Sequence, residues 1–258
     1  MTVTHTTTAM AMDFTLTVVG DVSPDAIDLV APHLAADLAW VDEVFSTYRA
    51  DSWVSRLSSG TATVADAPPA VAEVLDLCER FRDETGGWFD ARTPTGGLDP
   101  TGIVKTWAME RSRWRLGLLG GSGWSYACAG DITVAGAAPT DAGWRIGIAD
   151  PRDPPGPRAR SVSAVTLGGG KRAATCLATS GRSGAPGHIW APRRSRGPEV
   201  AQASVRGSDL VQCDAWATAI VAGGLEVAQR APEFGMEVMA LRIVGERVKS
   251  FSTPRWSV

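Results

Sequence analysis

The stretch QCDAWATAI, residues 212–220, places an aspartate and a threonine four positions apart in an alanine-rich segment. Alanine favours helix, and apolar residues continue as far as Leu225, so the stretch predicts a helix. On a helix, Asp214 and Thr218 share one face, and their oxygen atoms lie one turn apart. Taken alone, the pair is best explained as part of an N-terminal cap region, where Asp214 would lie near the positive helix end. That explanation leaves open why two hard oxygen donors should be stacked on one face.

A second candidate is GLDPTGIVKTWAMER, in which Asp99 and Thr101 precede a predicted helix. The first amides of such a helix could face an anion, and Lys105 would lie one turn inside. The alternative is a helix cap followed by a lysine that extends its stem along apolar surface and its ammonium into water. Lys105 is also one of only three lysines in the chain.

The third candidate is His188 in TSGRSGAPGHIWAP, a glycine-rich loop that follows a predicted strand. Such loops let a backbone approach a ligand closely, and a histidine there can act as a base near neutral pH. A surface histidine without function explains the residue equally well. LGGGKRAA, residues 167–174, lacks the GxxxxGK[ST] spacing of a phosphate loop, and we interpret it as a hairpin turn.

The elements that must position these residues follow from periodicity. Apolar positions that recur every three or four residues predict helices over 26–45 and 69–84 and a third helix from Gly102. A loop is expected over 46–60, and His5 is expected in a frayed terminus. Alternating, β-branched runs bounded by glycine and proline predict short antiparallel strands. These are residues 13–19, 124–130, 131–136, 144–150, 160–167 and 173–180, with a final strand at 237–244 that closes the chain.

The composition, with 258 residues, 44% hydrophobic and 21% charged, is that of an ordinary globular protein. A net charge of -3 gives no electrostatic reason to expect nucleic acid or an anionic membrane. The four cysteines show no CxxC spacing, so neither a zinc site nor a redox motif is predicted, and buried free thiols in a reducing compartment are expected. No signal peptide and no bilayer-spanning run is evident, so we expect a cytoplasmic protein without a membrane partner.

Eight short motifs in one order resemble the ApbE family, the FAD:protein FMN transferases. They are MAMDF, FSTYRADSWVSRLS, GGWFDA, LDPTGIVKT, AGDI, TSG, HI and DAWAT, and they extend over essentially the whole chain. The resemblance and the element order together predict an α+β fold, a single ApbE-like (T-fold-like) unit over 1–258 with mostly antiparallel sheets flanked by helices. The implied reaction is Mg²⁺-dependent transfer of FMN from FAD to a threonine of a client flavoprotein through a phosphoester bond, with release of AMP. An FAD pyrophosphatase and a non-catalytic flavin-binding protein are the alternatives.

The resemblance also implies roles for particular residues. Mg²⁺ would be held by Asp214, Thr218 and the backbone carbonyl of Gly102, a set of hard oxygen ligands that suits the ion. The pair in QCDAWATAI is then better explained as a metal clamp than as a cap, and His188 would take the proton of the acceptor threonine. The residues that would hold FAD are Met10, Ser46, Thr47, Tyr48, Trp88, Phe89, Asp90, Asp99, Lys105, Thr179, Ser180, Gly181 and Ile189.

The sequence departs from the family pattern at several positions. The glycine that follows the lysine in the family is Thr106 here, and the first glycine of GGD is Ala129. Ser58 replaces an asparagine, Ala191 replaces an aspartate, and the MGT segment reads Met10-Ala11-Met12. These positions are expected mostly to shape loops and the pocket, whereas the metal pair, the lysine and the histidine are retained.

Overall fold

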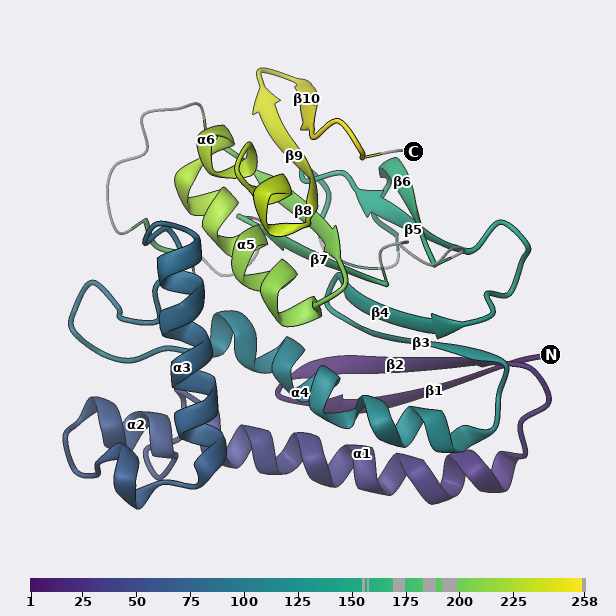
Figure 1. Cartoon of the computed structure of the whole chain (residues 1–258), viewed down its shortest axis with the longest axis horizontal. Helices are drawn as coiled ribbons and strands as arrows, with labels where there is room; N and C mark the ends of the chain where they lie inside the picture. Colours follow the sequence, from purple (N-terminus) through teal and green to yellow (C-terminus); the bar gives the residue numbers. More distant parts are fainter. Residues whose placement is uncertain (155, 157, 169–174, 183–188, 192–198, 257–258) are drawn as a thin grey trace.

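A large antiparallel sheet is the central element of the protein (Figure 1). The computed structural model describes residues 1–258 except 155, 157, 169–174, 183–188, 192–198 and 257–258. Eight strands form the sheet in the order β1-β2-β3-β4-β7-β8-β9-β10, and β5 pairs only with β6 in a separate hairpin. The strands are β1 (Thr2–Ala9), β2 (Met12–Val19), β3 (Gly123–Cys128), β4 (Asp131–Gly136), β5 (Trp144–Ala149), β6 (Ser161–Leu167), β7 (Cys176–Gly181), β8 (Gln202–Gly207), β9 (Glu237–Val244) and β10 (Arg247–Ser252).

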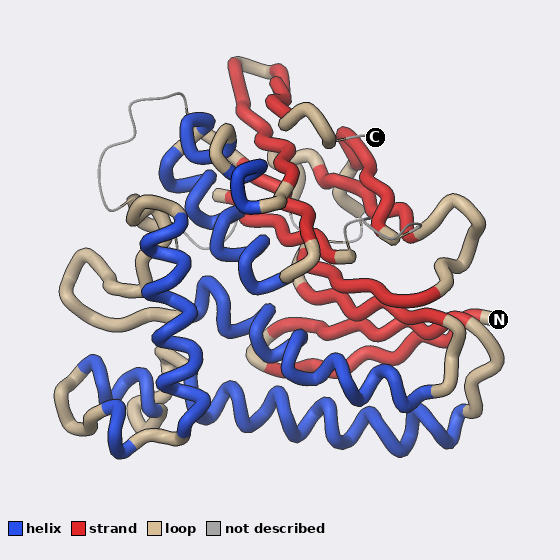
Figure 2. Tube along the Cα trace, in the orientation of Figure 1, coloured by secondary structure: helices blue, strands red, loops and turns tan. Residues whose placement is uncertain are grey.

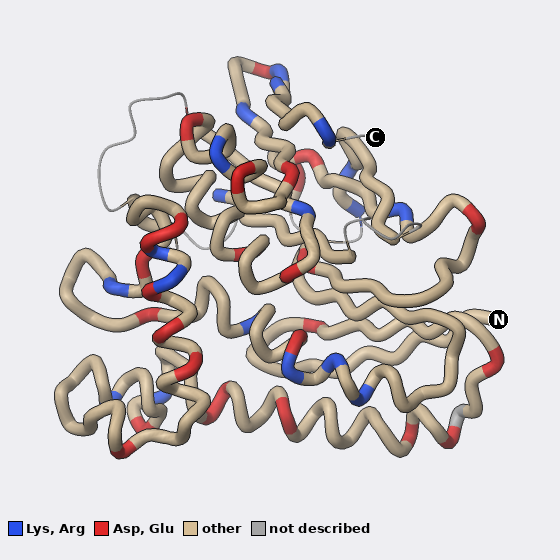
Figure 3. The backbone as a smooth tube through the Cα atoms, viewed as in Figure 1, with Lys and Arg blue, Asp and Glu red and all other residues tan. Residues whose placement is uncertain are grey.

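Three helices, α1, α4 and α5, cover one face of this sheet (Figure 2). The helices are α1 (Pro24–Phe45), α2 (Trp53–Ser58), α3 (Pro69–Glu84), α4 (Thr101–Leu116), α5 (Leu210–Gly223) and α6 (Leu225–Ala228), with short 3-10 turns at Val64–Asp66, Gly117–Leu119 and Ala231–Phe234. Acidic and basic positions are mixed along α3 (Figure 3), where Arg80 pairs with Glu84 and Arg82 with Glu79. No helix in the described part of the chain is long and apolar enough to cross a bilayer.

Two hydrophobic cores lie on opposite faces of the sheet, as the alternation along its strands shows. On β7, Ala178 belongs to the core beneath the helices, and its neighbour Leu177 belongs to the second core. On β9, Ala240 and Leu241 divide in the same way. The second core also contains Val165 and other residues of the β5–β6 hairpin, so this hairpin covers the face that the helices leave free. The middle strands of the sheet are therefore buried on both sides.

The predicted helices at 26–45, 69–84 and from Gly102 are confirmed as α1, α3 and α4, and the α+β antiparallel class is confirmed. Three predictions about elements are wrong, and one strand was missed. The expected frayed terminus with His5 is strand β1, and the expected loop at 46–60 contains α2. Strand β8 was not predicted, and β10, not 237–244, is the last strand. The turn expected at 167–174 falls largely on 169–174, which lie outside the described residues; the flanking strands do not pair with each other, since β6 pairs with β5 and β7 pairs with β4 and β8.

Candidate active site

Two tight turns lie side by side at one end of the sheet. Met10 and Ala11 join β1 to β2, and Ala129 and Gly130 join β3 to β4. All four residues have positive φ values, of 50°, 56°, 49° and 95°. Two-residue hairpins with positive φ at both central positions match the twist of the strands, but only glycine adopts that conformation without strain. Three non-glycine residues in this conformation at one sheet end mark it as a place where backbone strain is tolerated.

The carboxyl end of β7 adjoins the β3–β4 turn. A Cβ atom placed on Gly130 would lie 3.6 Å from Cβ of Thr179, so the two segments are in van der Waals contact distance. The backbone N–H of Thr179 donates to Oδ1 of Asp131, the first residue of β4, at 2.8 Å. The Thr179 hydroxyl also forms a hydrogen bond with Ser204 on β8, with the two oxygens 2.9 Å apart. The predicted residues Met10 and Thr179–Gly181 are thus placed at the same end of the sheet.

Lys105 on α4 points into this end of the sheet. Its Nζ lies 2.5 Å from Oδ2 of Asp131, whose side chain is completely buried. Burial lowers the pKa of Lys105, but the carboxylates of Asp131 and Asp214 outweigh this effect and hold the pKa above its ordinary value. The lysine is therefore a charged, inward-facing partner of a buried aspartate, and the alternative of an ammonium extended into water is wrong.

Asp214 lies in the second turn of α5, not at its start. The N-cap of α5 is Asp209, whose Oδ1 accepts a hydrogen bond from the N–H of Gln212 at 3.1 Å. Asp214 is 4% exposed, and its Oδ2 lies 3.0 Å from the hydroxyl of Thr106 on α4. Burial and the nearby Asp131 raise its pKa from 3.8 to about 7, against the opposing effects of Lys105 and Thr106. The cap interpretation of Asp214 is wrong.

Thr218 follows one turn later on α5 and is half-buried. Its hydroxyl oxygen lies 3.0 Å from that of Ser180 on β7, so the two predicted residues are in direct contact. Gly102 is in the first turn of α4, where a Cβ atom would come within 3.0 Å of the Phe89 ring. Close packing against this ring accounts for glycine at that position.

The donor set fits a hard divalent cation. Lys105, Thr106, Asp131 and Asp214 form a cluster at this end of the sheet. The cluster contains two buried carboxylates, Asp131 and Asp214, but a single ammonium, and Lys105 is already paired with Asp131. An ionised Asp214 is thus left without an ion-pair partner among the described residues, which is a costly state for a buried carboxylate. Among the described residues, no group of three or more His, Cys, Asp or Glu side chains is arranged to hold a metal. A magnesium site here would use one carboxylate together with a hydroxyl, a carbonyl and oxygens from outside the protein.

Three further predicted residues have structural partners. Asp99 accepts hydrogen bonds at Oδ1 from the N–H and the hydroxyl of Thr101, at 3.0 and 2.5 Å, and so supports the start of α4 as a cap would. Asp90 pairs with Arg82, with the nitrogen and oxygen 3.3 Å apart. Phe89 is 3% exposed and packs edge-to-face on Phe81, with the ring centroids 6.4 Å apart.

The remaining predicted residues lie around these elements. Trp88 packs on Gly223 at the end of α5, where a Cβ atom would come within 2.6 Å of the indole. Ser46 ends α1, and its Oγ accepts a hydrogen bond from the N–H of Tyr48, a residue whose side chain is 97% exposed. Thr47 lies between them and is half-buried, and Ile189 packs against the core beneath the helices. His188 lies outside the described residues.

Sequence reasoning missed two members of the cluster. Asp131 was part of the AGDI motif but was not assigned a role, although an aspartate directly after a tight turn at a strand end was the available signal. Thr106 was noted only as a departure from the family glycine. Its contact with Asp214 joins residues that are 108 positions apart, and no local sequence pattern predicts such a contact.

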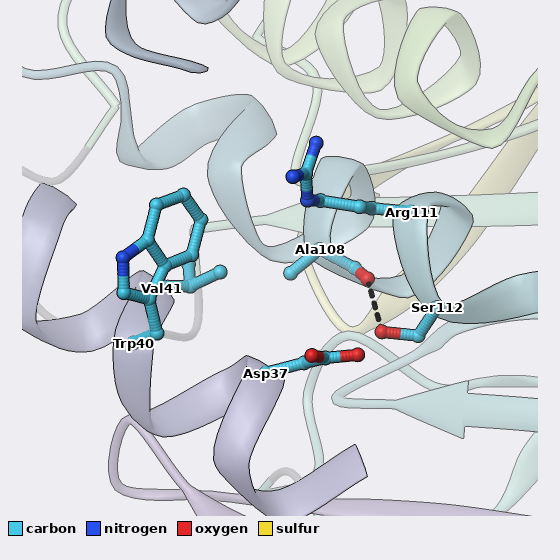
Figure 4. Close-up of a pocket in the computed structure, with 6 residues that line it drawn as sticks. All are labelled: Asp37, Trp40, Val41, Ala108, Arg111 and Ser112. Atoms are coloured by element: carbon cyan, nitrogen blue, oxygen red, sulfur yellow. Dashed lines mark hydrogen bonds between the residues drawn. The ribbon is translucent and has the colours of Figure 1, made fainter. Parts of the chain in front are cut away.

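Two cavities lie away from this cluster. One, of about 160 Å³, lies between α1 and α4 and is lined by Asp37, Trp40, Val41, Ala108, Arg111 and Ser112 (Figure 4). The other, of about 210 Å³, is lined by Leu75, Cys78, Glu79, Asp90, Ala91, Arg92 and Leu98. Asp90 is the only predicted site residue that lines either of these two cavities.

The sequence pattern of the ApbE family matches residues 10–95 and 91–240. Flavin transferase ApbE from Vibrio cholerae is 18% identical, covers 99% of this chain and 98% of its own, and superposes with a TM-score of 0.79. The apo form of Pseudomonas stutzeri flavinyl transferase ApbE is 20% identical, with coverages of 98% and 95% and a TM-score of 0.79. The ApbE protein of Thermotoga maritima is 14% identical, with 96% of each chain covered and a TM-score of 0.74. At these identities the likeness establishes the fold. No curated protein matches the sequence.

Proposed function

The chain belongs to the ApbE family, and from that premise we propose that it is a Mg²⁺-dependent FAD:protein FMN transferase. In the proposed reaction, the hydroxyl oxygen of a client threonine forms a bond to the phosphorus of the FMN half of FAD. The bond between that phosphorus and the bridging oxygen breaks, and AMP leaves with the oxygen. The observation that carries this proposal is the buried carboxylate of Asp214, which has Thr218 one turn away and no ion-pair partner in the described part of the chain.

Mg²⁺ would be held by Asp214, by the hydroxyl of Thr218 and by the backbone carbonyl of Gly102, with substrate phosphate and water as the other ligands. When bound, the ion would neutralise charge on the pyrophosphate as AMP leaves. The protein prepares for this by burying Asp214, because a buried carboxylate attracts a cation more strongly than an exposed one does. Ser180 supports Thr218 through the hydrogen bond between their hydroxyls.

The other residues of the proposed site bind and orient the dinucleotide. Lys105 is ion-paired with Asp131, and 18% of its side chain is exposed. An ammonium carries three N–H donors, so in this proposal it would also donate to a phosphate oxygen. The exposed ring of Tyr48 offers a face on which a planar ring system of FAD can stack. Met10 and Thr179–Gly181 supply backbone at the strained sheet end, and Ile189 lies beside the core.

A further group of residues acts through the shape of the site. Asp99 orders the start of α4, and Phe89 packs against Gly102 in the same turn. Trp88, Asp90, Ser46 and Thr47 line the approach for FAD in this proposal. His188 would accept the proton from the client threonine as the new phosphorus–oxygen bond forms and would then pass it to water.

The test incubates the protein with FAD, Mg²⁺ and candidate client flavoproteins, and then measures in-gel flavin fluorescence of the client and release of AMP. Transfer predicts a fluorescent client and one AMP for each flavin attached. FMN and AMP without a labelled client would instead indicate an FAD pyrophosphatase. Bound FAD that stays intact would indicate a flavin-binding protein. The matched control is Asp214→Asn, which keeps the shape of the side chain and removes its charge.

A further inference from the structure

Two consecutive residues of α4 reach two different buried carboxylates. Lys105 pairs with Asp131 on β4, and Thr106 forms a hydrogen bond with Asp214 on α5. Neighbouring residues on a helix point about 100° apart, so consecutive side chains of α4 can contact two different elements, β4 and α5. The two carboxylates are the first residue of β4 and a residue in the second turn of α5.

The contact between Thr106 and Asp214 is a feature of this chain. Thr106 is fully buried, and its hydroxyl oxygen lies 3.0 Å from Oδ2 of Asp214 and 3.0 Å from the carbonyl oxygen of Ile103. In the family pattern this position is glycine, which has no side chain to offer a carboxylate. No other side chain or backbone group in the described part of the chain forms a hydrogen bond with the Asp214 carboxylate.

We propose that Thr106 is a positioning residue that fixes the orientation of the Asp214 carboxylate for Mg²⁺; the inference rests on the proposed function. The terminal torsion of an aspartate is broad, so a carboxylate without a partner samples many orientations. A hydrogen bond to one oxygen restricts this torsion before the ion arrives and leaves the other oxygen for the ion. Partners of this kind behind a metal ligand typically change metal affinity by about 10- to 100-fold.

The chain offers a matched control on the same helix. Ser112 is also buried, and its hydroxyl donates to the carbonyl of Ala108 at 3.0 Å (Figure 4). It resembles Thr106 in burial and in bonding to a carbonyl of its own helix, but it forms no hydrogen bond with Asp131 or Asp214. Ser112→Ala therefore removes a buried helix hydroxyl without touching Asp214.

The experiment titrates Mg²⁺ by calorimetry into the protein saturated with FAD, without a client. We expect Thr106→Val to weaken Mg²⁺ binding about tenfold or more, while Thr106→Ser and Ser112→Ala bind as the parent does. Melting temperatures without metal show whether each variant folds. If Thr106→Val does not fold, Thr106→Ala takes its place with the same expectation.

Parental affinity in Thr106→Val, or an equal loss in Ser112→Ala, overturns the inference and leaves the proposed metal site standing. Failure of Thr106→Ser to restore binding also overturns it, because the hydroxyl would then not be the active group. A parent protein that binds no Mg²⁺ in the presence of FAD overturns the metal site and, with it, this inference.

Discussion

Asp214→Asn tests both the burial of the carboxylate and the proposed metal site. The substitution keeps the size of the side chain and an oxygen that can accept from Thr106, but it removes the negative charge. In the unfolded chain the pKa of Asp214 is 3.8, and in the metal-free fold burial and Asp131 raise it to about 7. The two pKa values differ by about 3 units, and each unit corresponds to about 1.4 kcal/mol. Ionisation of Asp214 should therefore cost the metal-free fold about 4 kcal/mol.

The direction of the pH dependence follows from which state holds the proton. Below pH 3.8 both states are protonated, and the charge of Asp214 has no effect. Between that pH and about 7, the unfolded chain loses the proton while the folded protein keeps it, so the free energy of unfolding falls as the pH rises. Above pH 7 the full cost remains until a cation binds. The asparagine variant has no group that ionises at this position, so its free energy of unfolding lacks this pH dependence.

The assay is urea unfolding of parent and variant in the presence of a chelator, at several values between pH 4 and 8. We expect the variant to gain on the parent across this range by up to about 4 kcal/mol. Addition of Mg²⁺ to the FAD-saturated proteins at pH 8 should stabilise the parent further and leave the variant nearly unchanged. A difference between the two proteins that stays constant within about 1 kcal/mol from pH 4 to 8 would refute the reasoning, because Asp214 would then ionise as an exposed carboxylate does.

Three further predictions concern neighbouring residues. Thr218→Val keeps the shape of the side chain and removes its oxygen, so it should slow FAD turnover with a client about tenfold or more at low Mg²⁺, a barrier rise of roughly 1.4 kcal/mol. Excess Mg²⁺ should restore the rate of Thr218→Val more readily than that of Asp214→Asn. A parental rate at low Mg²⁺ would exclude Thr218 as a ligand. His188→Ala should lose transfer and one limb of the pH–rate profile while FAD affinity persists in equilibrium binding; an equal loss of binding would point to an orienting role instead. Lys105→Met leaves Asp131 buried and unpaired, so urea unfolding should show a loss of about 3–5 kcal/mol. Adding Asp131→Asn should recover most of that loss, and no recovery would mean that the ion pair is not the cause.

Local patterns in the sequence identified most of the helices because helical periodicity involves residues three and four positions apart. The helix at 69–84 was predicted with the bounds it has, and the tryptophan-rich helix from Gly102 begins one residue earlier, at Thr101. Strand β1 was missed because TVTHTTTA carries only one large aliphatic side chain, Val3, and so lacks the apolar alternation of a half-buried strand. It forms a strand because it pairs with β2 over its whole length, from Thr2 opposite Val19 to Ala9 opposite Met12.

The order of short motifs along the chain was sufficient to indicate the family, because motif order survives when overall identity falls to 14–20%. It also selected Lys105, Asp214 and Thr218, three residues that the structure gathers at one end of the sheet. The motifs did not predict the position of each residue within its helix equally well. Taken alone, Asp214 was interpreted as part of the N-terminal cap region, whereas Asp209 caps the helix. Both aspartates precede helix-forming residues, and only the backbone conformation distinguishes them.

The sequence by itself determined the four long helices, the α+β class and the residue types available for chemistry, because these depend on neighbours a few positions apart. Only the tertiary structure decided that β6 and β7 lie in separate sheets, that Lys105 forms an ion pair with Asp131, and that Thr106 forms a hydrogen bond with Asp214. Lys105 and Asp131 come together because the Lys105 side chain extends from α4 to the first residue of β4, and Thr106 reaches Asp214 because α4 packs on α5. Such partners are determined by the packing of whole elements around a buried core. The free energy of that packing depends on contacts between residues far apart in the sequence, so no short stretch of the chain predicts it.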